Sequence, residues 1–149
     1  MSEHDCHRTM AAEMFNRTWD LLDAGERTPE ADRRLLAAAY ASYAHWREVG
    51  TPKNHSVSDW QVSRVWAALG DAGHAAEYGA EALRIAEEHD LGAFYVAYGH
   101  EALARAATLR GDAAERDRRL AAAEAMLDDI DEAESAELIR NDLEAIRAL

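Results

Sequence analysis

The sequence has a single cysteine, Cys6, which excludes an internal disulfide. It also has no long hydrophobic run, because Ser42 and His45 interrupt the most apolar stretch, Leu35–Trp46, and that stretch is too short to cross a bilayer. The residues Ser2–Asp5 are polar and lack the apolar segment of a signal peptide. We therefore expect no membrane partner and a cytoplasmic location.

Positive charge is scarce in this chain. The 149 residues include 16 Lys and Arg against 29 Asp and Glu, which gives a formal net charge of −13 at pH 7. A surface of this sign repels the phosphate backbone, so we expect no nucleic acid partner. The same charge keeps a protein soluble and does not by itself indicate a function.

The motifs of common catalytic sites are also missing. The sequence has no glycine-rich phosphate loop, no Gly-x-Ser-x-Gly elbow and no Cys-x-x-Cys pair. Its seven histidines do not follow a zinc spacing such as His-Glu-x-x-His. No reaction is indicated by a motif, so whether the protein is an enzyme stays open, and no cofactor is expected.

What the chain does contain is helical periodicity. Apolar residues recur at helical spacing, and no stretch alternates at the period of a strand. With 48% apolar residues the chain can bury a core, so we expect one all-α domain over residues 1–149. The first helix is predicted from about Asp5 to Leu22 and the second from Pro29 to Val49, with a loop over residues 51–57 before the third.

The stretch Ser58–Leu83 is predicted to form two helices joined by a tight turn. Ser58 and Gln61 have the spacing of an N-terminal capping box. Gly70 suits the left-handed position that ends a helix. The pair Gly70-Asp71 recurs as Gly111-Asp112, 41 residues later, as expected of a repeated helical pair.

A last helix is predicted after Asp131, which we expect to act as its N-cap. Ile139, Leu143 and Ile146 would form its buried face, and its other face is charged. A helix with one apolar and one charged face is typical of the terminal cap of a repeat array.

The second helical pair carries a recognisable run of residues. In chain order these are Leu69-Gly70-Asp71, Ala75, Glu77-Tyr78 and Ala82-Leu83. This run resembles the tetratricopeptide repeat, a weaker likeness continues over Phe94–Met126, and the wider pattern is similar to small stand-alone bacterial helical-repeat proteins. The resemblance implies a right-handed α-solenoid of three helix-turn-helix hairpins plus a C-terminal capping helix.

In that family the first helix of each pair lines a concave groove. The resemblance therefore implies ligand-binding residues on the first helices of two pairs. On each helix they are spaced three or four positions apart, so they share one helix face. The expected ligand-binding residues are Trp60, Arg64, Tyr98, Glu101 and Arg105. Trp60 would provide an aromatic floor, although plain core packing explains an indole at this position equally well.

Arg64, Glu101 and Arg105 form the sharpest polar set. Two arginines and a carboxylate can clamp a carboxylate or phosphate ligand, since the guanidinium group matches such anions. The alternative is a structural ion-pair network between adjacent helices, because such networks commonly imitate binding sites.

The histidines offer a different kind of site. His7, His45 and His100, on three helices, would form a metal site or a general base if they converged, and the catalytic candidates are then His45, His100 and Glu101. His45 lies on an apolar stripe, where a hydrogen-bonded core histidine is the more usual case. His4 and Cys6 stand near His7 without a zinc spacing.

Three functional hypotheses follow from these patterns. The first is a binding module that holds a peptide, a protein segment or a small molecule in the groove. The second is a small-molecule enzyme or metal-binding protein with a histidine site between helices. The third is a scaffold subunit that forms a homodimer and binds no small ligand.

Overall fold

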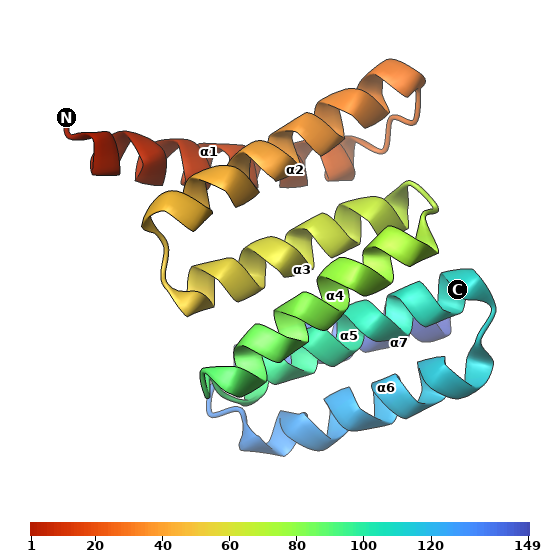
Figure 1. Cartoon of the computed structure of the whole chain (residues 1–149). Coiled ribbons are helices and arrows are strands. Elements are labelled where there is room, and N and C mark those ends of the chain that lie inside the picture. Colours follow the sequence, from red (N-terminus) through yellow and green to blue (C-terminus); the bar gives the residue numbers. More distant parts are fainter.

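The computed structural model describes residues 1–149, which form seven α-helices and no strand (Figure 1). The predicted all-α class is confirmed. The helices are α1 (Glu3–Ala24), α2 (Pro29–Val49), α3 (Pro52–Ala68), α4 (Ala72–Glu88), α5 (Ala93–Arg110), α6 (Ala113–Met126) and α7 (Ala133–Arg147). A short 3-10 helix, Leu127–Asp129, follows α6. None of the helices combines the length and the apolar character that a membrane crossing requires.

The helices pack in pairs that are adjacent in the sequence: α1 with α2, α3 with α4, and α5 with α6. In Figure 1, α2, α4 and α6 form an outer layer nearer the viewer, while α1, α3 and α5 lie behind them, with α3 in contact with both α1 and α5. The last helix, α7, packs against α5 and lies behind it in the same view. Helix α5 therefore lies at the centre, in contact with α3, α4, α6 and α7.

The repeated glycine–aspartate pair forms the predicted turns. Gly70 and Gly111 have φ of +82° and +77°, a left-handed conformation that glycine adopts without strain. The following aspartates cap the next helices: an Asp71 carboxylate oxygen accepts the His74 amide at 2.9 Å, and Asp112 accepts the Glu115 amide at 3.1 Å.

The start of the third helix differs from the prediction. Residues 51–57 are not a loop, because α3 already begins at Pro52. Asn54 Oδ1 accepts from Thr51 N at 3.0 Å and from Thr51 Oγ1 at 3.1 Å, which closes the first turn. Threonine at the N-cap followed by proline is as good a helix start as the Ser58 motif, and it comes earlier in the chain.

The predicted cap at Ser58 is consequently wrong. Ser58 lies inside α3, buried, and its hydroxyl has no hydrogen-bond partner. Gln61 does not complete a capping box, because its side-chain amide donates to the carbonyl oxygen of Phe15 in α1 at 3.0 Å. Gln61 therefore connects α3 to α1, and Ser58 lies within the helix and not at its end.

Two further boundaries also differ. Helix α1 begins at Glu3, with Ser2 as its N-cap, so the helix starts before the predicted Asp5. Glu132, and not Asp131, occupies the N-cap position of α7. The predicted buried face of that helix is confirmed, since Ile139, Leu143 and Ile146 are fully buried.

Small residues dominate the core. Alanine supplies 14 of the 24 buried hydrophobic residues, so helix backbones approach closely. The closest approach joins α4 to α5 at Gly99, where an added Cβ would lie 2.7 Å from Leu83 Cβ and 2.8 Å from Leu83 Cα. A side chain at this position would push the two backbones apart.

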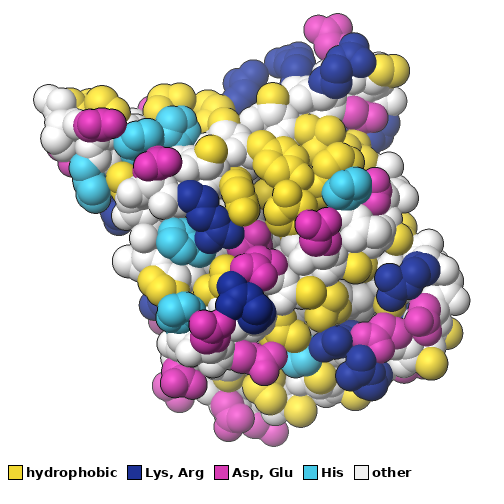
Figure 2. Space-filling model, in the orientation of Figure 1, with side chains coloured by type: hydrophobic (Ala, Val, Ile, Leu, Met, Phe, Trp, Pro, Cys, Tyr) yellow, Lys and Arg dark blue, Asp and Glu magenta, His cyan; other side chains and the backbone are white.

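An aromatic cluster joins α2 to α3 and α4 on the outer face, where Figure 2 shows a hydrophobic area over α2 and α4. Trp66 Nε1 donates to Tyr40 Oη at 2.9 Å, and that hydroxyl donates to Tyr78 Oη at 3.0 Å. Tyr43 packs edge-on against Tyr40 and Tyr78. The polar atoms of the Trp66, Tyr40 and Tyr78 rings are thus satisfied within the cluster.

A buried ion pair also connects α2 with α3. Arg47 donates to Asp59 Oδ2 at 2.7 Å, while Asp59 is fully buried and its Oδ1 has no partner. Burial raises the pKa of Asp59 from its ordinary 3.8 to about 6, because desolvation outweighs the effect of Arg47. The folded protein therefore binds a proton at Asp59 more tightly than the unfolded chain does.

We expect Gly99→Ala to lower the free energy of unfolding by about 1–3 kcal/mol, because the new methyl group must displace Leu83. Gly73→Ala is the matched control: that helical glycine is exposed, and an added Cβ meets only an Asp71 oxygen at 3.6 Å. The control should be neutral or stabilise by up to about 1 kcal/mol. Urea unfolding measures both, and equal effects would contradict the close-packing argument.

Asp59 should give folding a distinctive pH dependence. Its folded pKa exceeds its unfolded pKa, so its contribution favours the folded state at low pH and is lost as pH rises from about 4 to about 6. Relative to Asp59→Asn, the wild-type free energy of unfolding should fall across this window by up to about 3 kcal/mol. The measurement is urea unfolding at several pH values, with the exposed Asp23→Asn as control. A difference that does not vary with pH would refute the prediction.

Candidate functional site

A cavity of about 420 Å³ lies on the inner layer, where side chains of α1, α3, α4, α5 and α7 meet. Most of its lining is aromatic or aliphatic. The aromatic members are Trp19, Trp60, Phe94, Tyr95 and Tyr98. The smaller apolar members are Val57, Ala82, Gly99 and Leu138, and the polar members are Ser56, Arg64 and Asp142. Volume and lining are those of a small-molecule site.

The aromatic rings form a continuous wall across three helices. The ring centroids of Trp60 and Tyr98 are 4.8 Å apart, and Trp19 lies 5.4 Å from Trp60 on the other side. Phe94 packs edge-on against Tyr98 at 5.1 Å. Because these rings brace one another, the wall is set before any ligand arrives.

Glu101 holds Trp60 in place from behind. Its carboxylate is fully buried, and Oε2 accepts the Trp60 indole N–H at 2.7 Å. The other oxygen accepts from Arg105 Nη2 at 2.7 Å and from Arg105 Nε at 3.2 Å. Glu101 and Arg105 therefore pair with each other on α5, and neither lines the cavity.

Arg64 has no such partner. Of the 16 Lys and Arg residues, eight lie within 4.0 Å of a carboxylate, and among the other eight Arg64 is the only one that is not exposed. Its guanidinium carbon lies 5.9 Å from the Trp19 ring centroid. Burial lowers the pKa of Arg64, and the positive charge of Arg105 lowers it further. The negative charges of Glu101 and Asp142 act in the opposite direction, but neither carboxylate lies within 4.0 Å of Arg64. Arginine stays charged in proteins, so the cavity contains a cation without a direct ion-pair partner.

Asp142 reaches the cavity from α7. The Tyr98 hydroxyl donates to Asp142 Oδ2 at 2.9 Å, and no side chain donates to Oδ1. Burial, and then the negative charge of Asp142, raise the pKa of Tyr98, so this phenol stays neutral and keeps donating. No ion pair joins Asp142 to Arg64, although both line the same cavity.

The structure brings together three of the five residues predicted to bind a ligand. Trp60, Arg64 and Tyr98 line the cavity, whereas Glu101 and Arg105 lie behind Trp60. The sequence analysis missed Asp142. The sequence did contain an indication of this residue. Asp142 lies between Ile139 and Leu143, two positions predicted to be buried, so its carboxylate is at the edge of the packed face of α7.

The three candidate histidines do not meet. His7 Nδ1 and His45 Nδ1 are 2.8 Å apart and share a hydrogen bond between α1 and α2. His100 instead accepts from Arg119 of α6 at 3.1 Å, and burial and Arg119 lower the pKa of His100. The predicted site that joins all three histidines is therefore wrong. His7 and His45 face each other between α1 and α2, whereas His100 faces α6. No group of three or more His, Cys, Asp and Glu side chains has a geometry that holds a metal ion.

Comparison with family models, with curated proteins and with solved structures finds no match for this chain.

Glu101→Gln should disturb the wall behind the cavity. Trp60 and Arg105 donate to different oxygens of Glu101, so in glutamine one of these donors would face an NH2 group, and Arg105 loses its carboxylate. We expect the free energy of unfolding to fall by about 2 kcal/mol or more. The control is Glu137→Gln, which removes an exposed pair with Arg140 and should cost less than about 1 kcal/mol in urea unfolding. Similar losses in the two variants would contradict the role given to Glu101.

Proposed function

We propose that this protein is a helical-repeat binding module that holds its ligand in the aromatic cavity of the inner layer. The arrangement proposed for the chain is a right-handed α-solenoid of three helical hairpins with α7 as the cap, similar in plan to tetratricopeptide-repeat proteins. Two observations support it. The helices pack in sequence-adjacent pairs, and the Gly70-Asp71 turn recurs at Gly111-Asp112.

The proposed ligand combines a flat apolar group with an anionic group. The observation that carries this proposal is Arg64, a half-buried cation without a carboxylate or a hydrogen-bond acceptor, in a cavity whose other lining is mostly aromatic. A cation removed from water without a partner costs free energy, which an anionic ligand would offset. The apolar group would lie against Trp60 and its neighbours.

The ligand can be a free small molecule or a group on a peptide or protein segment. A second cavity of about 270 Å³ shares Val57 and Tyr95 with the first and continues toward Trp46 and Lys53. A longer ligand could follow both cavities, whereas a small molecule would fill the first alone. The charge requirement at Arg64 is the same in the two cases.

Isothermal titration calorimetry with a panel of arylalkanoates tests the proposal. The panel contains 3-phenylpropanoate, 2-naphthylacetate and indole-3-acetate, each paired with its uncharged amide. At least one acid should bind saturably and about tenfold or more tightly than its amide, since a charge-assisted hydrogen bond contributes about 1.5–3 kcal/mol.

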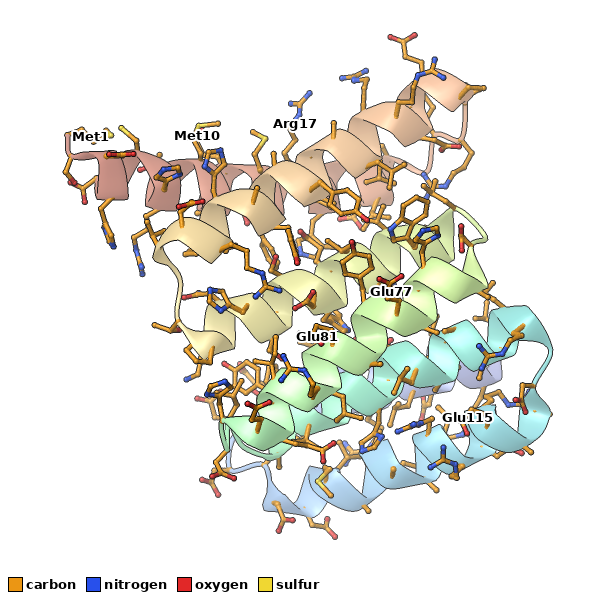
Figure 3. The ribbon with its side chains drawn as sticks, viewed as in Figure 1. Met1, Met10, Arg17, Glu77, Glu81 and Glu115 are labelled. Atoms are coloured by element: carbon orange, nitrogen blue, oxygen red, sulfur yellow. The ribbon has the colours of Figure 1, made fainter.

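Arg64→Gln should remove the preference for the acid and leave the affinity for the amide unchanged. The matched control is Arg17→Gln on α1, an exposed arginine without an ion pair that points away from the other helices in Figure 3. The control should bind like the wild type. Acids that bind no better than their amides, or an Arg64→Gln variant that keeps the preference, would contradict the proposed site.

A further inference from the structure

The cavity contains a second polar group with unused hydrogen-bonding capacity. Asp142 Oδ2 is engaged by the Tyr98 hydroxyl at 2.9 Å, while Oδ1 accepts from no side chain. Asp142 is half-buried and lines the same cavity as Arg64. Ser56, the remaining polar member of the lining, already donates to the Ala82 carbonyl at 2.9 Å.

The two charged groups do not satisfy each other. No ion pair within 4.0 Å joins Arg64 to Asp142, so each presents its charge separately within about 420 Å³ of largely aromatic space. A ligand with only an anionic group would compensate the charge of Arg64. It would also exclude water from the Asp142 carboxylate without donating a hydrogen bond to it. Covering an unpaired carboxylate costs free energy, so such a ligand would lose part of what it gains at Arg64.

The position of Asp142 is held by the same ring that walls the cavity. Tyr98 is 9% exposed and packs between Trp60 and Phe94, so its hydroxyl has little freedom to move. Its hydroxyl occupies Oδ2 and leaves Oδ1 as the oxygen with open hydrogen-bonding capacity. The cavity therefore contains one cationic donor, the Arg64 guanidinium, and one anionic acceptor, the Asp142 carboxylate, which the Tyr98 hydroxyl holds.

We propose that the ligand is a zwitterion of the amino acid type with an aromatic or large apolar side chain. Its carboxylate would bind the Arg64 guanidinium, its ammonium group would donate to Asp142 Oδ1, and its side chain would pack on Trp60 and Phe94. This inference rests on the proposed function and adds to it the requirement for a cationic group. The cavity would thus recognise a carboxylate and an ammonium group on the same largely apolar molecule.

Calorimetry with three matched ligands tests this requirement. L-phenylalanine carries both charges, 3-phenylpropanoate lacks only the ammonium group, and phenethylamine lacks only the carboxylate. We expect L-phenylalanine to bind about tenfold or more tightly than either of the other two, which corresponds to one charge-assisted hydrogen bond. The equivalent sets built on L-tryptophan and L-leucine cover a larger and a non-aromatic side chain.

Variants separate the two charges. Asp142→Asn should weaken L-phenylalanine about tenfold while 3-phenylpropanoate binds as before or more tightly. Arg64→Gln should weaken both of these ligands. The control is Glu144→Gln on the same helix as Asp142. Glu144 is exposed and has no ion pair, so this variant should leave the affinity for both ligands unchanged.

Tyr98→Phe removes the hydroxyl but keeps the ring. It should lower the affinity for L-phenylalanine more than that for 3-phenylpropanoate.

The outcomes distinguish this inference from the proposed function. If 3-phenylpropanoate binds as tightly as L-phenylalanine, or if Asp142→Asn weakens both equally, the zwitterion is wrong and the anion site stands. If arylalkanoates bind but none of the three amino acids does, the zwitterion is likewise wrong. If neither the amino acids nor any arylalkanoate binds saturably, both the inference and the proposed function are wrong.

Discussion

The close contact between α4 and α5 is the constraint on which the rest of this structure depends. At Gly99 the α5 backbone lies so near Leu83 that even a methyl group does not fit. Helix α5 also packs against α3, α6 and α7, so a change in its position would affect all three contacts. Tyr98, which lines the cavity, and Glu101, which holds Trp60 in place from behind, both lie within two residues of this contact. A shift of α5 would therefore move the wall as well as the core.

Buried charge is handled in two different ways. Asp59 and Glu101 are fully buried, and each accepts from an arginine, Arg47 and Arg105 respectively. Arg64 is half-buried and has neither a carboxylate partner nor a hydrogen bond. Since buried ions in proteins are ordinarily paired, the missing partner at Arg64 supports a ligand more strongly than the aromatic lining does.

Helix α7 has two roles in this arrangement. Its apolar face, with Ile139, Leu143 and Ile146, covers the core beside α5. Its neighbouring positions, Leu138 and Asp142, complete the cavity. The same helix that covers the core thus contributes the carboxylate on which the proposed recognition of a zwitterion depends.

Local patterns were enough to predict much of this protein. Helical periodicity predicted the all-α class and the buried face of α7, and the glycine–aspartate pairs marked two turns, because glycine enters the left-handed region and aspartate caps the next helix. The three- and four-residue spacing also grouped Trp60 with Arg64, both of which line the cavity. These features depend on residues close together in the sequence.

Only the tertiary structure decided which neighbour covers each face. Two valid helix starts precede Gln61, and α3 begins at the earlier one. The longer helix lets Ser56 donate to Ala82 of α4 and lets Asp59 accept from Arg47 of α2. Packing also turned Glu101 and Arg105 behind Trp60, separated His100 from the pair formed by His7 and His45, and brought Asp142 to the cavity from the far end of the chain. Spacing along a helix determines which side chains share a face, whereas the rotation of that helix against its neighbours determines what the face meets.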